Sequence, residues 1–237
     1  MRGEHRGARR SRTLVLAALP LLISIACGGG DSDGAGPTQP PATTVPTAAA
    51  SPTQSAAAFN PSRLSAAAMA MEHVTSLLGA NIQTLRDKVT DPNLPFSSAP
   101  AIGAALSAQG VHLIYSSYQA GAAPAAGRPF AVQNTVQGYP SAANATAAFT
   151  ALRTTWQGTL FQNLQQQPNL GAAWEESFCQ LGNFATAGGQ QQQWFVCMAR
   201  QGPYVATVSI GSFPNMDVNF VAPLVSSYFD EASRGLR

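Results

Sequence analysis

The chain has 237 residues, of which 10% are charged, against about 25% in an ordinary globular protein. Hydrophobic residues make up 45%, but alanine, with 42 copies, accounts for much of that share. This composition excludes a charged disordered protein, a long coiled coil and a polytopic membrane protein. The formal net charge of +2 is too small for the concentrated basic patch of a nucleic-acid-binding protein.

Residues 1–26 predict a secretory signal peptide. They begin with a basic region that carries five arginines. An apolar stretch, residues 14–26, follows, and its 13 residues are too few to cross a bilayer, which needs about 20. A basic region, a short apolar segment and a small residue before the cut, here Ala26, are the features of a signal that is removed after export.

Cys27 and the Gly28-Gly29-Gly30 run that follows it resemble the lipobox of bacterial lipoproteins. In that family a signal peptidase cuts before a cysteine that has received a diacylglycerol. The resemblance implies that Cys27 is lipidated and holds the protein on the extracytoplasmic face of a cell membrane. Ser24 departs from the family, which usually has Leu, Val or Ile at the third position before the cut. An ordinary signal peptide with a nearby cut is the alternative.

The cysteine count fits this interpretation. The chain has three cysteines, an odd number that needs a reason in an exported protein. If Cys27 carries the lipid, Cys179 and Cys197 remain as a pair for a disulfide in an oxidising compartment. That bond would contribute about 3 kcal/mol by restricting the unfolded chain. Two buried free thiols are the alternative, and a metal site is disfavoured because no further His or Cys lies near enough in sequence to complete four ligands.

Segment 27–59 predicts a disordered tether. Residues 28–58 are almost entirely Gly, Pro, Thr, Ala, Ser and Gln, and they include no aromatic residue. Such a segment cannot bury enough apolar surface to offset the entropy lost on ordering. The remaining residues, 60–237, suffice for one hydrophobic core but not for two, so we expect a single extracytoplasmic domain after the tether.

Four segments of this domain have the apolar spacing of helices. They cover residues 60–89, 99–109, 141–164 and 217–233. Asn60 and Pro61 begin the first as its N-cap and first helical residue. The apolar stripe of this helix is formed by Leu64, Ala67, Met71, Val74, Leu78, Ile82, Leu85 and Val89. The stripe of the third is formed by Ala145, Phe149, Leu152, Trp156, Leu160 and Leu164. Pro223 lies inside the fourth pattern and delays the start of regular helix there.

Five segments favour strands through their β-branched and aromatic content or their alternation: residues 111–118, 130–137, 174–181, 193–200 and 204–210. Residues 130–140 and 204–214 also echo each other, since each begins with an aromatic residue and ends in aromatic-Pro before a helix. The echo suggests two strand–strand–helix units, although a Pro-containing turn between a strand and a helix is common. We predict an α+β domain in which an antiparallel sheet of about five strands packs against helices.

Catalytic chemistry has little support in the sequence. His73 and His112 are the histidines that remain after signal removal, and structural or surface roles suit both. Glu175 and Glu176 are adjacent, so on a strand they would point to opposite faces. No motif for a nucleophile elbow, a phosphate-binding loop, a dinucleotide site or a zinc protease occurs. We therefore predict no enzyme activity, no catalytic or metal-ligating residues and no cofactor.

Aromatic residues are the remaining candidates for a binding site. Tyr115, Tyr118, Trp174 and Trp194 fall on predicted strands and could line a ligand cleft on the sheet, with ordinary core packing as the alternative. Trp156 lies on the stripe of the third helix and is expected in the core.

The C-terminal part of the chain carries a family resemblance. The residues concerned run from Cys179-Gln-Leu-Gly182 through Cys197-Met-Ala-Arg200 to Tyr204-Val-Ala-Thr-Val-Ser-Ile210. They resemble actinobacterial lipoproteins of unassigned role and the extracellular sensor domain of mycobacterial membrane Ser/Thr kinases. The latter implies a disulfide-braced antiparallel sheet with helices that form a ligand cleft, although that domain has two disulfides. The PsbP-like α/β sandwich of other exported lipoproteins fits the order of strands and helices about as well.

Together these features predict a lipid-anchored, extracytoplasmic binding or accessory module of a bacterial cell envelope. Its partner would be a small apolar ligand, an envelope component or a membrane protein. An envelope hydrolase with a spatially assembled site and a structural protein without a pocket are the alternatives. From Asn60 onward eight basic and eight acidic residues cancel, so electrostatic attraction to nucleic acid or to anionic lipid is not expected. Attachment to the membrane would then depend on the lipid.

Overall fold

The computed structural model describes residues 60–91, 104, 106–157, 161–170, 173–185 and 191–237. The predicted signal peptide, the tether and Cys27 lie outside these residues. The elements, in chain order, are α1 (Ser62–Ala67), α2 (Met71–Leu78), β1 (Ile82–Val89), β2 (His112–Ala120), β3 (Pro129–Gly138), α4 (Ala142–Thr155), β4 (Gln162–Gln167), β5 (Glu176–Ala185), β6 (Gln191–Gln201), β7 (Tyr204–Ser212) and α5 (Val218–Leu236).

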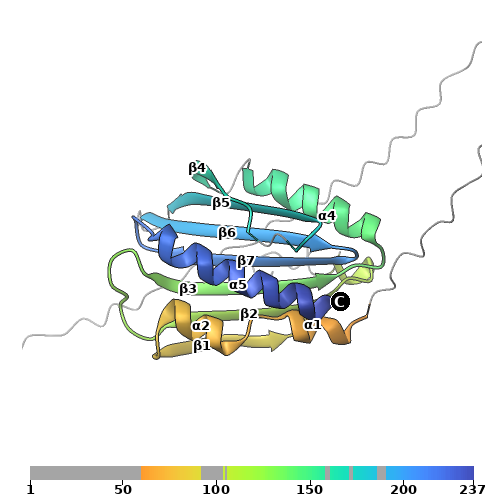
Figure 1. Cartoon of the computed structure of the whole chain (residues 1–237), viewed down its shortest axis with the longest axis horizontal. Helices are drawn as coiled ribbons and strands as arrows, with labels where there is room; N and C mark the ends of the chain where they lie inside the picture. Colours follow the sequence, from red (N-terminus) through yellow and green to blue (C-terminus); the bar gives the residue numbers. More distant parts are fainter. Residues whose placement is uncertain (1–59, 92–103, 105, 158–160, 171–172, 186–190) are drawn as a thin grey trace, which may run out of the picture.

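The seven strands form one antiparallel sheet in the order β1-β2-β3-β7-β6-β5-β4 (Figure 1). Strands β1 to β3 make one meander, and β4 to β7 make a second that returns to the first. The meanders meet where β3 pairs with β7, with Asn134 opposite Val208 at the middle of the ladder. The last strands of both meanders therefore lie at the centre of the sheet, and β1 and β4 form its edges.

Helices cover both faces of the sheet. Helices α1, α2 and α5 lie over one face and bury the first core, which includes Val132, Cys197 and Val208 from the strands. Helix α4 lies on the opposite face and buries the second core, which includes Val196 and Met198. Because side chains alternate along a strand, β6 supplies both cores, and this explains why its apolar residues run almost without interruption.

The predicted α+β class is confirmed, and the five predicted strands correspond to β2, β3, β5, β6 and β7. The predicted strand number is too low because both edge strands were assigned to helices. Strand β1 occupies the second half of the first predicted helix, and β4 occupies the end of the third. Each edge strand is largely exposed and lacks a clean alternation of buried and exposed residues, so its few apolar residues fitted a helical spacing.

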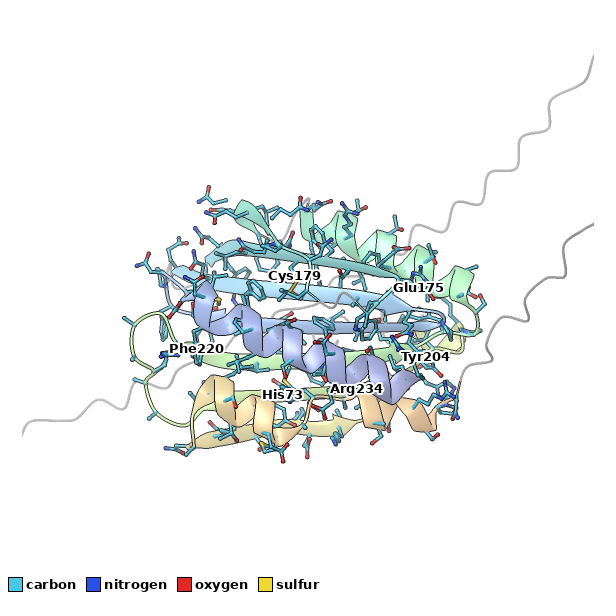
Figure 2. The ribbon with its side chains drawn as sticks, viewed as in Figure 1. His73, Glu175, Cys179, Tyr204, Phe220 and Arg234 are labelled. Carbon is cyan, nitrogen blue, oxygen red and sulfur yellow. A yellow bond between two sulfur atoms is a disulfide. The ribbon has the colours of Figure 1, made fainter. Side chains whose placement is uncertain are left out.

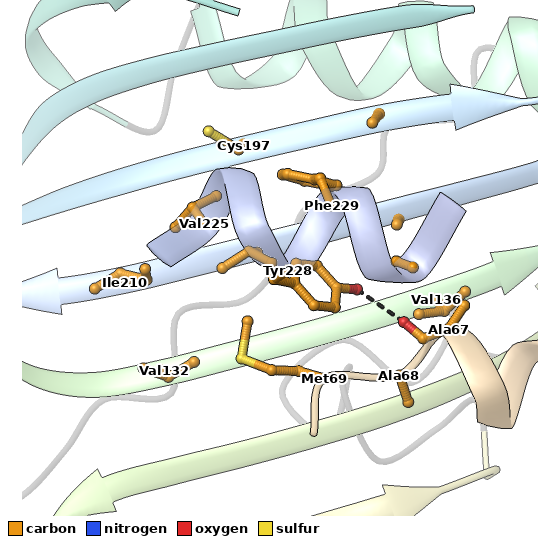
Figure 3. Close-up of a cluster of buried hydrophobic side chains, with 14 of the residues drawn as sticks. Ala67, Ala68, Met69, Val132, Val136, Cys197, Ile210, Val225, Tyr228 and Phe229 are labelled. Atoms are coloured by element: carbon orange, nitrogen blue, oxygen red, sulfur yellow. Dashed lines mark hydrogen bonds between the residues drawn. The ribbon is translucent and has the colours of Figure 1, made fainter. Parts of the chain in front are cut away.

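The first predicted helix is also divided into α1 and α2. Gly79, at φ 84°, ends α2, and its N–H donates to the carbonyl oxygen of Thr75. The break between the helices has a different cause. The Met69 N–H donates to Asn134 Oδ1, and the Ala67 carbonyl accepts a hydrogen bond from Tyr228 (Figure 3). Backbone groups that a continuous helix would use internally are thus bonded to the sheet and to α5.

The two helices of the predicted repeat lie on opposite faces of the sheet. If the two units were related by symmetry, a two-fold axis normal to the sheet at the Asn134–Val208 pair would superpose β3 on β7. Such a rotation does not exchange the two faces of the sheet, so α4 and α5 would lie on the same face. Instead α4 packs in the second core and α5 in the first. The meanders also differ, with three strands before α4 and four before α5. The units β2-β3-α4 and β6-β7-α5 are therefore not related by a two-fold axis of the sheet, and their origin by duplication stays a prediction.

The remaining helices agree with the sequence in part. Helix α4 begins after Ser141, whose Oγ accepts a hydrogen bond from the Asn144 N–H, and α5 continues through Pro223. Of the predicted helix 99–109, residues 104 and 106–109 are described; 104 and 106–108 are helical, and 109 lies in the turn that follows. Among the helices of the described ranges, none has the length and hydropathy needed to cross a membrane.

Candidate functional site

The four aromatic residues predicted to line a cleft do not share one. Tyr118 and Trp174 are buried in the first core, whereas Trp194 is buried in the second and Tyr115 packs at its margin. Tyr118 donates a hydrogen bond to Asp87, and the indole N–H of Trp174 donates to the Phe229 carbonyl. These residues lie on opposite faces of the sheet and serve packing. The structure therefore does not bring the four residues into one cleft, and Trp156 is buried as expected.

The predicted disulfide between Cys179 and Cys197 is confirmed. The two residues lie directly opposite each other in the ladder between β5 and β6, with Cα atoms 4.2 Å apart. Both are fully buried in the first core, and Figure 3 shows Cys197 beside Val225 of α5. Figure 2 shows the bond between β5 and β6, beside α5 in this view. The disulfide thus joins the two strands beneath the N-terminal half of that helix.

A pocket of 380 Å³ opens beside this disulfide, between the β4–β5 connection and the N-terminal half of α5. We call it the α5 pocket. Its residues come from the end of β4, the connection, β6 and α5: Gln167, Pro168, Leu170, Phe195, Val218, Asn219, Ala222, Pro223 and Ser226. Phe195 lies on the same face of β6 as Cys197, and Gln167 is opposite Cys179 in the ladder. The disulfide therefore links β6, which carries Phe195, to β5, the strand that pairs with Gln167 of β4.

The lining of the α5 pocket is apolar with a few uncharged polar groups. Gln167, Asn219 and Ser226 are its polar side chains, and none of the residues that line it carries a charge. Leu170, Val218 and Ala222 also pack against the first core. A largely apolar concavity with few polar groups is the usual form of a small-molecule site, and this volume falls within the range of about 300–1,000 Å³ for such sites.

Pro223 deprives a backbone carbonyl of α5, that of Asn219, of its helical hydrogen-bond donor. It lies inside α5, four residues after Asn219, and both residues line the pocket. In a regular helix the N–H of residue 223 would donate to the carbonyl of residue 219, but proline has no N–H. The Asn219 carbonyl therefore lacks its helical donor on the side of α5 that faces the pocket. No site was predicted here from the sequence; the proline inside the apolar pattern of this helix is the signal that could have located it.

Two further pockets lie near the ends of the sheet. One of 330 Å³ is lined by His112 and Gly110, among others, and one of 280 Å³ lies beside Arg128 and Phe220. In the latter the Arg128 guanidinium stacks over the Phe220 ring, 3.7 Å from its centroid. This stacking joins the loop before β3 to the start of α5 and helps to fix the N-terminal turns of that helix.

The titratable groups of the described residues do not assemble a nucleophile and its base around His73. His73 Nε2 lies 3.7 Å from Glu231 Oε2, and its Nδ1 is buried without a hydrogen-bond partner in the described part of the chain. The Tyr228 ring packs against His73 edge-on, with centroids 6.1 Å apart. Within the described ranges no group of three or more His, Cys, Asp or Glu side chains could hold a metal ion.

Glu175 and Glu176 do converge, contrary to the expectation from strand alternation. Glu175 precedes β5, so the alternation of that strand does not apply to it. Arg200 lies 2.7 Å from Glu175 and 2.8 Å from Glu176 in two ion pairs. Burial alone would lower the pKa of Arg200, but the two carboxylates outweigh it and raise the pKa. Both acids are engaged by one guanidinium, which suits a structural link between β5 and β6.

Comparisons with known proteins show where this fold occurs. The sequence matches no protein-family model and no curated protein. The fold is similar to the crystal structure of the extracellular domain of PknH from Mycobacterium tuberculosis, with a TM-score of 0.50 and 14% identity over 76% of this chain and 99% of that one. A protein of unknown function from Pseudomonas aeruginosa matches 52% of this chain and 81% of its own, with 11% identity and a TM-score of 0.28. At 14% identity the likeness to the PknH domain shows a shared fold.

Proposed function

We propose that this protein is a lipid-anchored, extracytoplasmic binding module of a bacterial cell envelope and that the α5 pocket is its ligand site. The observation that carries the proposal is the fold shared with the extracellular domain of PknH. It agrees with the export signal and with the lipobox cysteine, Cys27, in the sequence. The pocket favours a binding role over that of a structural protein without a cavity.

The disulfide supports the extracytoplasmic location. Cys179 and Cys197 are bonded and fully buried at the middle of the domain. Structural disulfides form and persist in oxidising compartments and are rare in the cytosol. The domain itself has eight basic and eight acidic residues, so it has no net charge with which to hold an anionic membrane. A lipid on Cys27 would attach the protein to the membrane without any contribution from the charge of the domain.

A binding role is also favoured over catalysis by the surroundings of His73. A catalytic histidine needs a proton donor or acceptor on each ring nitrogen, one of them on the reacting group. Nδ1 of His73 is buried and meets no such group among the described residues, and Nε2 is directed to Glu231. We therefore propose that the module binds its ligand without transforming it.

The anchor is tested by the Cys27→Ala variant of the full chain, expressed in the native organism. We expect the wild type in the membrane fraction, accessible to protease on intact cells and with a lipid-modified N-terminus by mass spectrometry. We expect the variant to lose the lipid and leave the membrane. Ser32→Ala, in the adjoining segment, is the matched control and should behave as wild type. Unchanged membrane association of Cys27→Ala would refute the lipid anchor.

A further inference from the structure

We propose that the α5 pocket binds a small, neutral, mainly apolar molecule that carries one hydrogen-bond donor, and that the backbone carbonyl of Asn219 accepts this donor. The inference rests on the proposed binding function and names the chemistry of its ligand. It depends on three properties of the pocket: an apolar lining, a helix on its wall in which Pro223 cannot donate to the Asn219 carbonyl, and the absence of charge among its lining residues.

The apolar part of the ligand would extend the first core. Phe195 is only 1% exposed and lies at the base of the pocket, with Leu170, Val218 and Ala222 packed against the same core. An apolar molecule seated there removes its own surface and theirs from water, which is the main favourable term in such binding. The 380 Å³ volume limits the ligand to a small molecule.

The donor on the ligand is specified by Pro223. The carbonyl of a helical residue points along the helix toward the residue four positions later, so the Asn219 carbonyl lies between the two α5 residues that line the pocket. With proline at that later position the oxygen has a lone pair available to an outside donor. A ligand hydroxyl or N–H seated in the pocket can supply it. Such a bond adds orientation and a modest gain in affinity, since it replaces a bond to water.

The absence of charged side chains among the lining residues argues against an ionised ligand. No lining residue carries a charge, and the nearest charge along α5 is the carboxylate of Asp217, which caps the helix and accepts a hydrogen bond from the Phe220 N–H. A ligand carboxylate would lose hydration without gaining a cation among the lining residues. An ammonium group would find no lining carboxylate. A neutral ligand avoids both costs.

The pocket walls are held in place before any ligand arrives. The Cys179–Cys197 disulfide fixes the strand that carries Phe195 to the strand paired with Gln167. On the opposite wall, α5 is tied to the sheet through Tyr228 and to the loop before β3 through the stacking of Arg128 on Phe220. A preformed site loses little conformational entropy when it binds, which favours a small ligand.

Three matched probes test the ligand class on the full mature chain in its Cys27→Ala form, which needs no detergent. They are 1-octanol, its isomer methyl heptyl ether, which lacks a donor, and octanoate. Titration followed by NMR and by calorimetry at neutral pH should show that the alcohol binds about fivefold more tightly than the ether, the gain of one hydrogen bond. Octanoate should show no saturable binding. Absence of binding by the alcohol, or octanoate binding as well as the alcohol, would overturn the proposal.

Substitutions at Pro223 test the acceptor. Pro223→Ala and Pro223→Gly both restore an N–H that can bond the Asn219 carbonyl, so the ratio of ether to alcohol dissociation constants should fall to about one. The two variants differ in helix propensity, which separates this effect from a change in helix stability. Pro214→Ala, at an exposed proline outside the pocket, is the matched control and should keep the fivefold ratio. A ratio unchanged in both Pro223 variants would disprove the role of the carbonyl.

Filling the pocket tests its location. Ala222→Trp should abolish binding of the alcohol and of the ether, whereas Ser227→Trp, at an exposed position of the same helix outside the pocket, should bind both normally. Circular dichroism and thermal unfolding establish that each variant is folded. Binding that survives Ala222→Trp would place the probes elsewhere and refute the site. These outcomes are independent of membrane fractionation, so failure of the ligand class and failure of the anchor are distinguishable.

Discussion

Asn134 of β3 and Tyr228 of α5 are hydrogen-bonded inside the first core, with Asn134 Nδ2 2.7 Å from the tyrosine oxygen. The Asn134 amide also donates to the Thr207 carbonyl and accepts from the Met69 N–H. The Tyr228 hydroxyl in turn donates to the Ala67 carbonyl (Figure 3). A single buried network therefore connects four segments of the chain: the α1–α2 junction, the two central strands β3 and β7, and α5.

This network predicts a large and coupled loss of stability on mutation. Asn134→Ala should lower the free energy of unfolding by about 2–4 kcal/mol, because it leaves the buried Met69 N–H without its acceptor and removes the donor to the Tyr228 oxygen. Tyr228→Phe should cost about 1–2 kcal/mol. Urea unfolding of the single variants and the double variant gives the coupling. We expect the double variant to cost less than the sum, and strict additivity would show that the two side chains act independently.

Removal of the disulfide should destabilise the domain through the unfolded chain. Cys179 and Cys197 are 18 residues apart, and the Cys179→Ala/Cys197→Ala variant should lose about 3 kcal/mol in urea unfolding. Reductant added to the unfolded wild type before refolding should reproduce this loss. The same variant should bind the octanol probe more weakly, because β5 and β6 lose their covalent link beside the α5 pocket. Equal stability of the oxidised wild type and the variant would contradict the prediction.

The central strands could be predicted from the sequence because burial leaves a pattern. Strands β3 and β7 are buried along nearly their whole length, and their β-branched content reflects it. The edge strands gave no such pattern. Leu85 is 37% exposed on β1, and Leu164 of β4 is only partly buried, so both residues fitted the stripes of amphipathic helices equally well. Pairing with β2 and β5, which is a tertiary effect, decides their structure.

The site was less predictable than the fold. The lining of the α5 pocket combines three segments, and their proximity depends on the return of the second meander and on the position of α5 over it. The aromatic cleft failed for a reason that the sequence did contain. Tyr115 and Tyr118 are three residues apart on one strand, and an odd separation places two side chains on opposite faces.

Buried tyrosines predict a loss of stability at alkaline pH. Burial, followed by the hydrogen bond to Asp87, raises the pKa of Tyr118 to about 12, and burial also raises the pKa of Tyr139 and Tyr228. An unfolded tyrosine has a pKa of about 10, so above that pH the unfolded state binds fewer protons than the folded state. The contribution of these tyrosines to the free energy of unfolding is thus complete below pH of about 10. It is lost as the pH rises toward the pKa values of the tyrosines in the folded state.

The measurement is the urea midpoint as a function of pH, together with the ultraviolet absorbance of tyrosinate. We expect the midpoint to fall above pH of about 10 while the absorbance of the folded protein lags behind that of the unfolded protein. Tyr118→Phe removes one of the groups and should give a shallower fall over the same range. Full ionisation of all five tyrosines near pH 10 without loss of structure would contradict the prediction.

Gly211 of β7 should not tolerate a side chain. A Cβ at this position would lie 2.9 Å from the Trp194 ring and 3.0 Å from the Phe130 ring, which pack edge to face over it in the second core. Because Gly211 is directly opposite Trp194 in the ladder, the strand backbone cannot move away without loss of pairing. Gly211→Ala should therefore cost about 1–3 kcal/mol in urea unfolding. Trp194→Phe makes room for the methyl group, so the same alanine should cost less in that background. An equal cost in both backgrounds would show that backbone propensity, and not contact with the indole ring, is the reason that position 211 requires glycine.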